Sequence, residues 1–130
     1  QTMQDNPNYN HVIGDIFLYF AQKIDSLRQL GVNDIILDPG FGFGKNLAHN
    51  YELLNYISDF SLFELPVLVG FSRKSMIYQL LKKTPNEGLN GTTVLNTIAL
   101  LQGAQILRVH DVEEAMEAIE IVETMKQAKR

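Results

Sequence analysis

Three short apolar runs, residues 34–37, 67–70 and 105–109, lie between longer segments with helical periodicity. None of the runs alternates apolar with polar residues, which is typical of strands buried on both faces in a parallel sheet. Strands that alternate with helices predict right-handed parallel β/α units with the helices outside the sheet. We therefore expect an α/β fold with three adjacent parallel strands in sequence order. No segment has the character of a linker, so residues 1–130 are expected to form a single domain.

Five helical segments are predicted from apolar periodicity, over residues 12–30, 51–57, 76–81, 92–102 and 112–125. Gly31 is well placed to end the first helix. Asn50 and Ser75 are the expected N-caps of the second and third helices. Asp111 and Glu114 have the spacing of a capping box at the start of the last helix.

Composition excludes several classes of function. The net charge of −4 gives no reason to expect a nucleic-acid partner. There are no cysteines, which excludes disulfides and thiolate metal sites and suits a reducing compartment. No apolar run approaches the roughly 20 residues that a membrane helix requires, and the first ten residues lack signal-peptide features. We expect a cytoplasmic protein without a membrane association.

The first strand end leads into a glycine-rich loop that begins with Asp38 and ends with Lys45. Two phosphate-binding motifs with similar sequences do not fit it. The P-loop needs a Gly where Pro39 stands and a Ser or Thr where Asn46 stands, and the dinucleotide motif needs a third Gly where Lys45 stands. The loop is expected to bring backbone N–H groups close to whatever lies above the sheet, with Asp38 at the rim.

The other two strand ends carry cations. Arg73 and Lys74 lie in the turn after residue 70, beside a predicted helix N-terminus that already favours anions. Arg108 and His110 are two residues apart on a strand, so they point to the same face. Such a pair suits a diphosphate, although an Arg paired with a carboxylate and a structural His would give the same pattern. Parallel β/α units place their chemistry at these strand ends.

Three motifs, in this order and spacing, resemble those of dihydropteroate synthase: residues 38–45 (DPGFGFGK), 70–75 (GFSRKS) and 108–112 (RVHDV). The resemblance covers essentially the whole chain. It implies folate biosynthesis, in which p-aminobenzoate is joined to 6-hydroxymethyl-7,8-dihydropterin diphosphate with Mg²⁺. It also implies sulfonamide inhibitors, a homodimer as the full-length enzyme, and a TIM (β/α)₈ barrel. This chain would supply the last three strands and their flanking helices.

The resemblance also implies roles for individual residues. Asp38 and Lys74 match residues that bind the pterin, and Phe43 and Ser72 match residues around the p-aminobenzoate pocket. A carboxylate suits the pterin, because two acceptor oxygens can face its N–H donors side by side.

Arg108 and His110 match the pair that binds the leaving diphosphate, so Lys74 and Arg108 are the expected catalytic residues. The implied reaction is a dissociative substitution at the exocyclic CH₂ of the pterin. On that mechanism the protein positions the reactants and stabilises the charge of the leaving group.

The chain departs from the family in length, because a complete barrel takes about 250 residues. The first five strands would be absent, and with them the Mg²⁺ ligand, so no metal ligand is expected in this chain. We expect a fragment of a full enzyme that is inactive alone.

Two alternatives remain open: a related pterin-binding methyltransferase barrel, and a non-catalytic half-barrel that pairs with another chain. Methyl transfer has no diphosphate to bind, so the cations at two strand ends argue against the first alternative.

Overall fold

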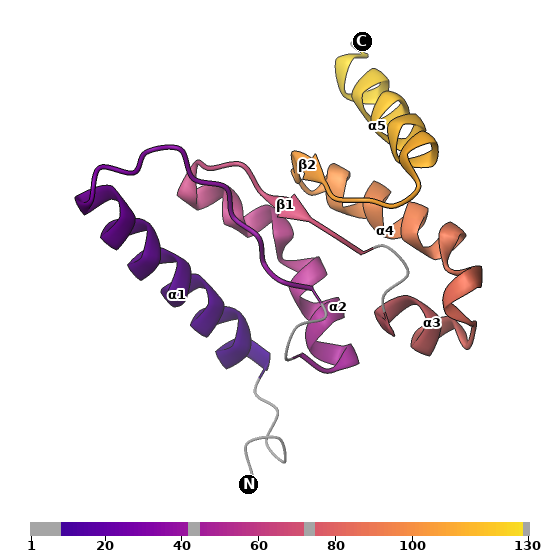
Figure 1. The fold of residues 1–130 in the computed structure, drawn as a ribbon, viewed down its shortest axis with the longest axis horizontal. Coiled ribbons are helices and arrows are strands. Elements are labelled where there is room, and N and C mark those ends of the chain that lie inside the picture. Colours follow the sequence, from indigo (N-terminus) through magenta and orange to yellow (C-terminus); the bar gives the residue numbers. More distant parts are fainter. Residues whose placement is uncertain (1–8, 42–44, 72–74, 129–130) are drawn as a thin grey trace, which may run out of the picture.

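The computed structural model describes residues 9–41, 45–71 and 75–128 (Figure 1). The described elements, in chain order, are α1 (Tyr9–Gln29), α2 (Leu47–Asn55), the 3₁₀ helix η2 (Ile57–Phe63), β1 (Leu68–Val69), α3 (Ser75–Leu81), the 3₁₀ helix η3 (Pro85–Glu87), α4 (Leu89–Leu101), β2 (Ile106–Leu107) and α5 (Val112–Gln127). All five predicted helices are present, with shifted ends.

The three predicted strands are parallel and adjacent in sequence order. Strands β1 and β2 pair with Leu68 opposite Ile106, and Leu37 forms a parallel bridge to Val67 on the other side of β1. The prediction of parallel β/α units is therefore confirmed, but the strands are shorter than predicted. The first is reduced to the bridge at Leu37, and residues 34–36 lie outside any strand. That segment has a neighbouring strand on one side only among the described residues, so few ladder hydrogen bonds hold it.

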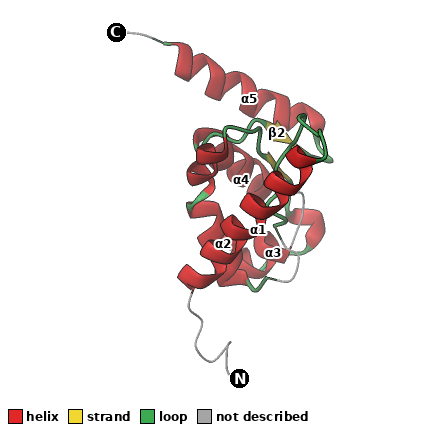
Figure 2. Cartoon of the chain, turned by 90° about the vertical axis from the view of Figure 1, so that its left-hand side faces the viewer, coloured by secondary structure: helices red, strands yellow, loops and turns green. Residues whose placement is uncertain are grey.

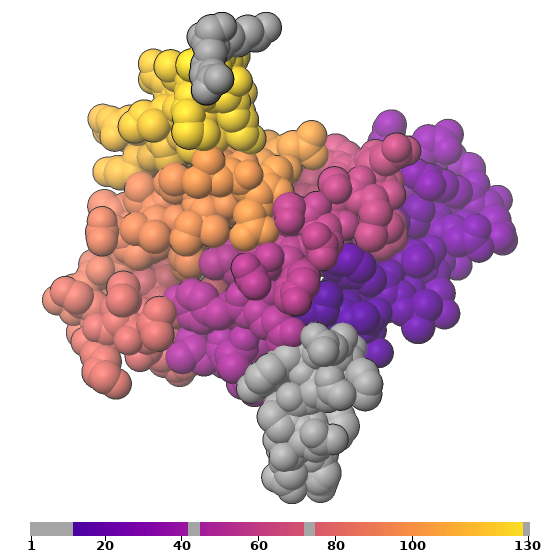
Figure 3. Space-filling model, turned by 180° about the vertical axis from the view of Figure 1, so that it is seen from behind, coloured from indigo at the N-terminus to yellow at the C-terminus, as the bar shows by residue number. Residues whose placement is uncertain are grey.

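The two faces of this small sheet differ in exposure. Leu37, Val67 and Val69 are buried in the hydrophobic core together with residues of the helices. On the opposite face Ile36 is 54% exposed and Leu68 is only half-buried. The helices thus cover one face and leave the other open. The space-filling view from behind shows the described residues packed side by side over that covered side (Figure 3).

Helix α1 is attached to the core through aromatic rings. The ring of Phe17 lies 4.5 Å from that of Phe60, and Phe20 lies 5.6 Å from Phe60, between ring centroids. Gly31 follows the helix with φ of 87°, a left-handed conformation that glycine adopts without strain. The predicted end of this helix is confirmed.

The prediction that Asn50 caps the second helix is wrong. Helix α2 starts earlier, and Asn46 is its N-cap: the side-chain oxygen accepts a 2.7 Å hydrogen bond from the His49 N–H. Asn50 lies inside the helix, 2% exposed, with its side-chain amide donating to the Asn46 carbonyl. Both residues suit a cap, and Asn50 is excluded because its backbone N–H already bonds the Asn46 carbonyl within the helix.

A capping box forms at η3, where none was predicted. The Glu87 backbone N–H donates to the Thr84 side chain, and the Glu87 carboxylate accepts from the Thr84 backbone N–H at 2.9 Å. Helix α4 begins at Leu89, three residues before the predicted start. One turn of α4 approaches α3 closely at Gly91, where an added Cβ would lie 2.5 Å from Cγ2 of Ile77.

Helix α5 follows Asp111 as predicted, but the expected capping box is absent: the Asp111 side chain makes no cap hydrogen bond. The helix packs mainly on α4 and projects from one end of the molecule (Figure 2). Near its C-terminus Lys126 donates a 3.0 Å hydrogen bond to the Leu100 carbonyl in the last turn of α4. Among the described residues, no helix has the length and apolar character needed to cross a membrane.

Candidate functional site

Asp38 stands directly after the bridged residue Leu37, where the backbone turns away from the sheet. Its Oδ1 accepts a 2.9 Å hydrogen bond from the Gly40 N–H, which closes a turn of the type that Asp favours. Gly40 has φ of 76°, so a side chain there would be strained. The carboxylate is exposed and oriented by its own loop.

Lys45 connects the far end of this loop back to its start. Its ammonium donates a 2.9 Å hydrogen bond to the Gly40 carbonyl. Partial burial lowers the pKa of Lys45 below its ordinary value, and the nearby Asp38 carboxylate opposes that shift. In the sequence Lys45 is only the last residue of a motif. Its contact with Gly40 becomes apparent in the folded loop.

Arg108 follows β2 immediately, and its backbone N–H donates to the Val69 carbonyl at 2.9 Å. The guanidinium lies against Gly70 on the neighbouring strand end. A Cβ built on Gly70 would be 3.1 Å from Nε and 3.2 Å from Nη2 of Arg108. Gly70 is not among the predicted site residues, because its position beside Arg108 depends on the register of the two strands.

The register of the sheet explains this neighbourhood. Since Val69 lies opposite Leu107, the next pair along the two strands is Gly70 and Arg108. Asp38, which follows Leu37, comes at the same C-terminal edge because all three strands are parallel. His110 is exposed two residues beyond Arg108. The structure thus places Asp38, Arg108 and His110 at one edge of the sheet, and their roles stay predictions.

Two buried rings lie at this edge, where the two loops begin. Phe41 and Phe71 are 1% and 0% exposed, and their ring centroids are 4.6 Å apart. Each ring belongs to the last described residue before a loop, so the loops begin side by side. Three predicted site residues in these loops, Phe43, Ser72 and Lys74, lie outside the described residues.

A hollow of about 290 Å³ adjoins Asp38 on the side of α1. Its lining combines the loop with one face of that helix: Asp15, Ile16, Tyr19, Phe20, Asp38, Pro39 and Lys45. Acidic, basic and aromatic groups thus lie together beside the Asp38 loop.

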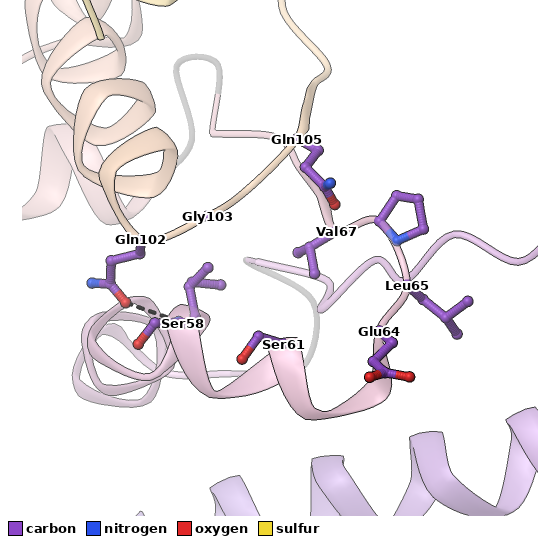
Figure 4. A pocket seen from close by; sticks show the side chains of 10 residues that line it. Ser58, Ser61, Glu64, Leu65, Val67, Gln102, Gly103 and Gln105 are labelled. Atoms are coloured by element: carbon purple, nitrogen blue, oxygen red, sulfur yellow. Dashed lines mark hydrogen bonds between the residues drawn. The ribbon is translucent and has the colours of Figure 1, made fainter. Parts of the chain in front are cut away.

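A larger hollow of about 490 Å³ lies at the opposite end of the sheet, between the segments that lead into β1 and β2 (Figure 4). The Ser58 N–H donates there to the side-chain oxygen of Gln102 at 3.1 Å. Ser61 and Glu64 also line it. It contains none of the predicted site residues.

No group of three or more His, Asp or Glu side chains within the described ranges could hold a metal ion. Asp38 is the one carboxylate of the predicted site, and one of its oxygens already accepts the Gly40 N–H. The described residues therefore do not form a magnesium site by themselves.

Parallel β/α units with polar groups at the C-terminal strand ends define the class of α/β proteins whose sites lie at that edge of the sheet. The family model described as "Pterin binding enzyme" matches residues 1–110. The chain belongs to this family.

Named relatives agree with that assignment. The chain is 50% identical, over 131 aligned residues, to the dihydropteroate synthase of Escherichia coli strain K12. That alignment covers 99% of this chain and 46% of the relative, so the chain spans about half the length of the curated relatives that it matches.

Solved structures confirm the fold class. The Yersinia pestis dihydropteroate synthase in a sulfonamide drug complex is 50% identical, with a TM-score of 0.86, over 90% of this chain and 43% of that one. The Coxiella burnetii dihydropteroate synthase in complex with pteroic acid is 35% identical, with a TM-score of 0.89, over 94% and 46%. Both neighbours are TIM barrels. The parallel units described above are part of such a barrel.

Proposed function

We propose that this chain forms the C-terminal part of a dihydropteroate synthase, which joins p-aminobenzoate to 6-hydroxymethyl-7,8-dihydropterin diphosphate in folate biosynthesis. The observation that carries the proposal is the meeting of Asp38, Arg108 and His110 at one edge of three parallel strands. One carboxylate and two potential cations at the same edge match a substrate with a donor-rich ring and an anionic leaving group. The similarity to named synthases supports the same reaction.

Asp38 binds the pterin ring in this proposal. The bond from the Gly40 N–H fixes one carboxylate oxygen and thereby the plane of the group. A carboxylate has about four lone-pair sites, so it can still accept the ring N–H and amino donors of the pterin. Lys45 connects the loop to the Gly40 carbonyl and keeps a positive charge near Asp38.

Arg108 and His110 hold the diphosphate. As the bond between the pterin CH₂ and the diphosphate oxygen breaks, the bonding electrons leave with that oxygen and its negative charge grows. The guanidinium offers two parallel N–H donors, and the imidazole of His110 adds a further donor. Groups that bind this charge more strongly in the transition state than in the substrate accelerate the reaction.

The p-aminobenzoate nitrogen then attacks the CH₂ of the pterin cation, forms the C–N bond and loses a proton. Lys74 holds the polar edge of the pterin, and Phe43 and Ser72 form the p-aminobenzoate pocket. Support for these three roles comes from the sequence motifs, together with the contact of Phe41 and Phe71 that brings the two loop starts together.

Magnesium, when bound, neutralises part of the diphosphate charge. The described residues do not fit a magnesium site on their own, so its ligand is proposed to come from the preceding part of the barrel. No step above depends on the metal.

The complete synthase is proposed to be a cytoplasmic homodimer that sulfonamides inhibit. The sulfonamide complex of the Yersinia pestis synthase supports the inhibitor. The dimer is supported by apolar side chains around a hollow of about 250 Å³ between α3 and α4. Leu80, Leu81 and Val94 are 50%, 47% and 49% exposed there. Such a patch suits a second copy of the same chain.

The test uses the complete protein with radiolabelled p-aminobenzoate and the pterin diphosphate, with formation of labelled dihydropteroate as the readout. We expect product with the complete protein and none with residues 1–130 alone. Arg108→Ala should lower kcat about 10²–10³-fold, by analogy with the loss of one oxyanion donor. Absence of product from the complete wild-type protein would contradict the proposal.

A further inference from the structure

We propose that Gly70 is a positioning residue: the space left by its missing side chain seats the guanidinium of Arg108 for bidentate binding of the diphosphate. The inference rests on the proposed function of Arg108, and it assigns a role to a residue that has no side chain. The observation behind it is the close approach of the Arg108 side chain to the Cα of Gly70.

The distances identify which side of the guanidinium faces Gly70. A Cβ at position 70 would be 3.1 Å from Nε, 3.2 Å from Nη2 and 3.5 Å from Cζ of Arg108. Because both nitrogens are closer than the carbon between them, the Cβ would stand in front of the Nε–Nη2 edge. That edge is therefore turned towards the glycine, and the Nη1–Nη2 fork on the other side of the guanidinium keeps two N–H donors for a phosphate.

Position 70 requires a glycine because the Arg108 side chain occupies the space beside it, and not because of its backbone conformation. Among the glycines that the structure describes, those with positive φ are Gly31, Gly40 and Gly103, and Gly70 does not belong to them. Its backbone conformation is therefore open to any residue. The sheet register fixes the approach, since the Arg108 N–H is bonded to the carbonyl of Val69, the residue before Gly70.

A side chain at position 70 has two possible effects on Arg108, and both harm the site. If the guanidinium stays in place, the new methyl group lies too close to Nε and Nη2 and strains both strand ends. If the guanidinium rotates away, the donors no longer point to where the diphosphate lies. Distances of 3.1–3.2 Å are tighter than ordinary van der Waals contact, so Ala forces a small shift and Val forces a larger one.

The test is a double-mutant cycle in the complete synthase with Gly70→Ala and Arg108→Ala. The readouts are KM for the pterin diphosphate, KM for p-aminobenzoate, and the affinity for inorganic pyrophosphate by calorimetry. Gly70→Ala should raise KM for the pterin diphosphate and weaken pyrophosphate binding about tenfold, roughly the value of one charge-assisted bond. KM for p-aminobenzoate should change less than about twofold, because Arg108 touches the leaving group only.

In the Arg108→Ala background the same Gly70→Ala change should cost less than about twofold, because the group that it displaces is gone. Arg108→Lys should also remove the sensitivity, since lysine carries a point charge without a donor fork. Equal effects of Gly70→Ala in all three backgrounds would overturn the inference.

Two other glycines serve as controls. Nothing lies within 4 Å of a Cβ at Gly14, so Gly14→Ala should leave every readout unchanged. Gly91→Ala clashes with Ile77 in the core, so it should lower the melting temperature without changing the ratio of the two KM values. If Gly70→Ala behaves like Gly91→Ala, its role is structural and the inference is wrong. If the wild type binds pyrophosphate yet forms no dihydropteroate, the proposed function fails while the calorimetry still decides the link between Gly70 and Arg108.

Discussion

The contact between Phe41 and Phe71 predicts that the two loops of the site are energetically coupled. Both rings are buried, their centroids are 4.6 Å apart, and the planes are inclined by 55°. Tilted aromatic pairs of this kind are worth about 0.5–1.5 kcal/mol beyond the area that they bury. Replacing either ring by leucine removes this pairing and keeps an apolar side chain in place.

Each single variant, Phe41→Leu or Phe71→Leu, should reduce the free energy of unfolding by about 1–2 kcal/mol, from lost burial and incomplete repacking. In the double variant the second substitution costs no further pairing energy, because the first has already removed the ring contact. The double variant should therefore be less destabilised than the sum of the singles, by about 0.5–1.5 kcal/mol.

Urea denaturation of the complete protein measures these differences, and a single variant should shift the midpoint by roughly 0.5–1 M. The matched control is Phe60→Leu, because Phe60 is 0% exposed and pairs with Phe17 beneath α1, away from the loops. Phe60→Leu should cost a similar amount of stability and leave KM for p-aminobenzoate unchanged, whereas Phe41→Leu and Phe71→Leu should raise it. Additivity of the two loop substitutions within about 0.3 kcal/mol would refute the reasoning.

Three further predictions concern charge and capping. Arg108→Ala should lower kcat about 10²–10³-fold while KM for p-aminobenzoate changes little, measured with the labelled substrate; a change confined to that KM would contradict the assignment. Asn46→Ala should destabilise the protein by about 1 kcal/mol in urea denaturation, because the His49 N–H loses its 2.7 Å acceptor; an unchanged midpoint would show that water replaces the cap at no cost. Hydrogen bonds from Thr84 hold the pKa of Glu87 below its ordinary value of 4.5. A lowered folded pKa gives stability that is present above pH 4.5 and is lost as pH falls through the folded value. Stability of the wild type should therefore decline more steeply in acid than that of Glu87→Gln, and parallel curves would exclude the linkage.

The order and direction of the elements could be predicted from sequence because the apolar patterns are local. Gly31 ends α1 as predicted, since a left-handed residue after a helix is a local requirement. The strand ends that carry Asp38 and Arg108 also followed from the pattern, because parallel strands bring their C-terminal ends to one edge.

Capping residues were predicted less well, because several residues with suitable side chains compete. Asn46 and Asn50 both satisfy the local rule, and Asn50 is excluded as the cap only because the helix starts one turn earlier, at Leu47. Asp111 has the correct spacing to Glu114 but makes no cap hydrogen bond, while Thr84 and Glu87 form a capping box around a 3₁₀ turn.

The contact between the Arg108 side chain and Gly70 could not be predicted, for a related reason. It requires Gly70 and Arg108, 38 positions apart, to become neighbours through the register of β1 and β2. Register is a tertiary property, set by how the apolar faces of both strands meet the helices. The contact of Lys45 with Gly40 likewise appears only once the loop has folded back.

The close approach of α4 to α3 at Gly91 restricts how this protein can change during evolution. A methyl group at position 91 would lie 2.5 Å from Cγ2 of Ile77, a separation that real side chains do not tolerate. Alanine at position 91 therefore becomes acceptable only after residue 77 has lost that branch, for example as leucine. Substitutions at these two positions must accumulate in one order, and in related sequences we expect residues 77 and 91 to vary together although they lie on different helices.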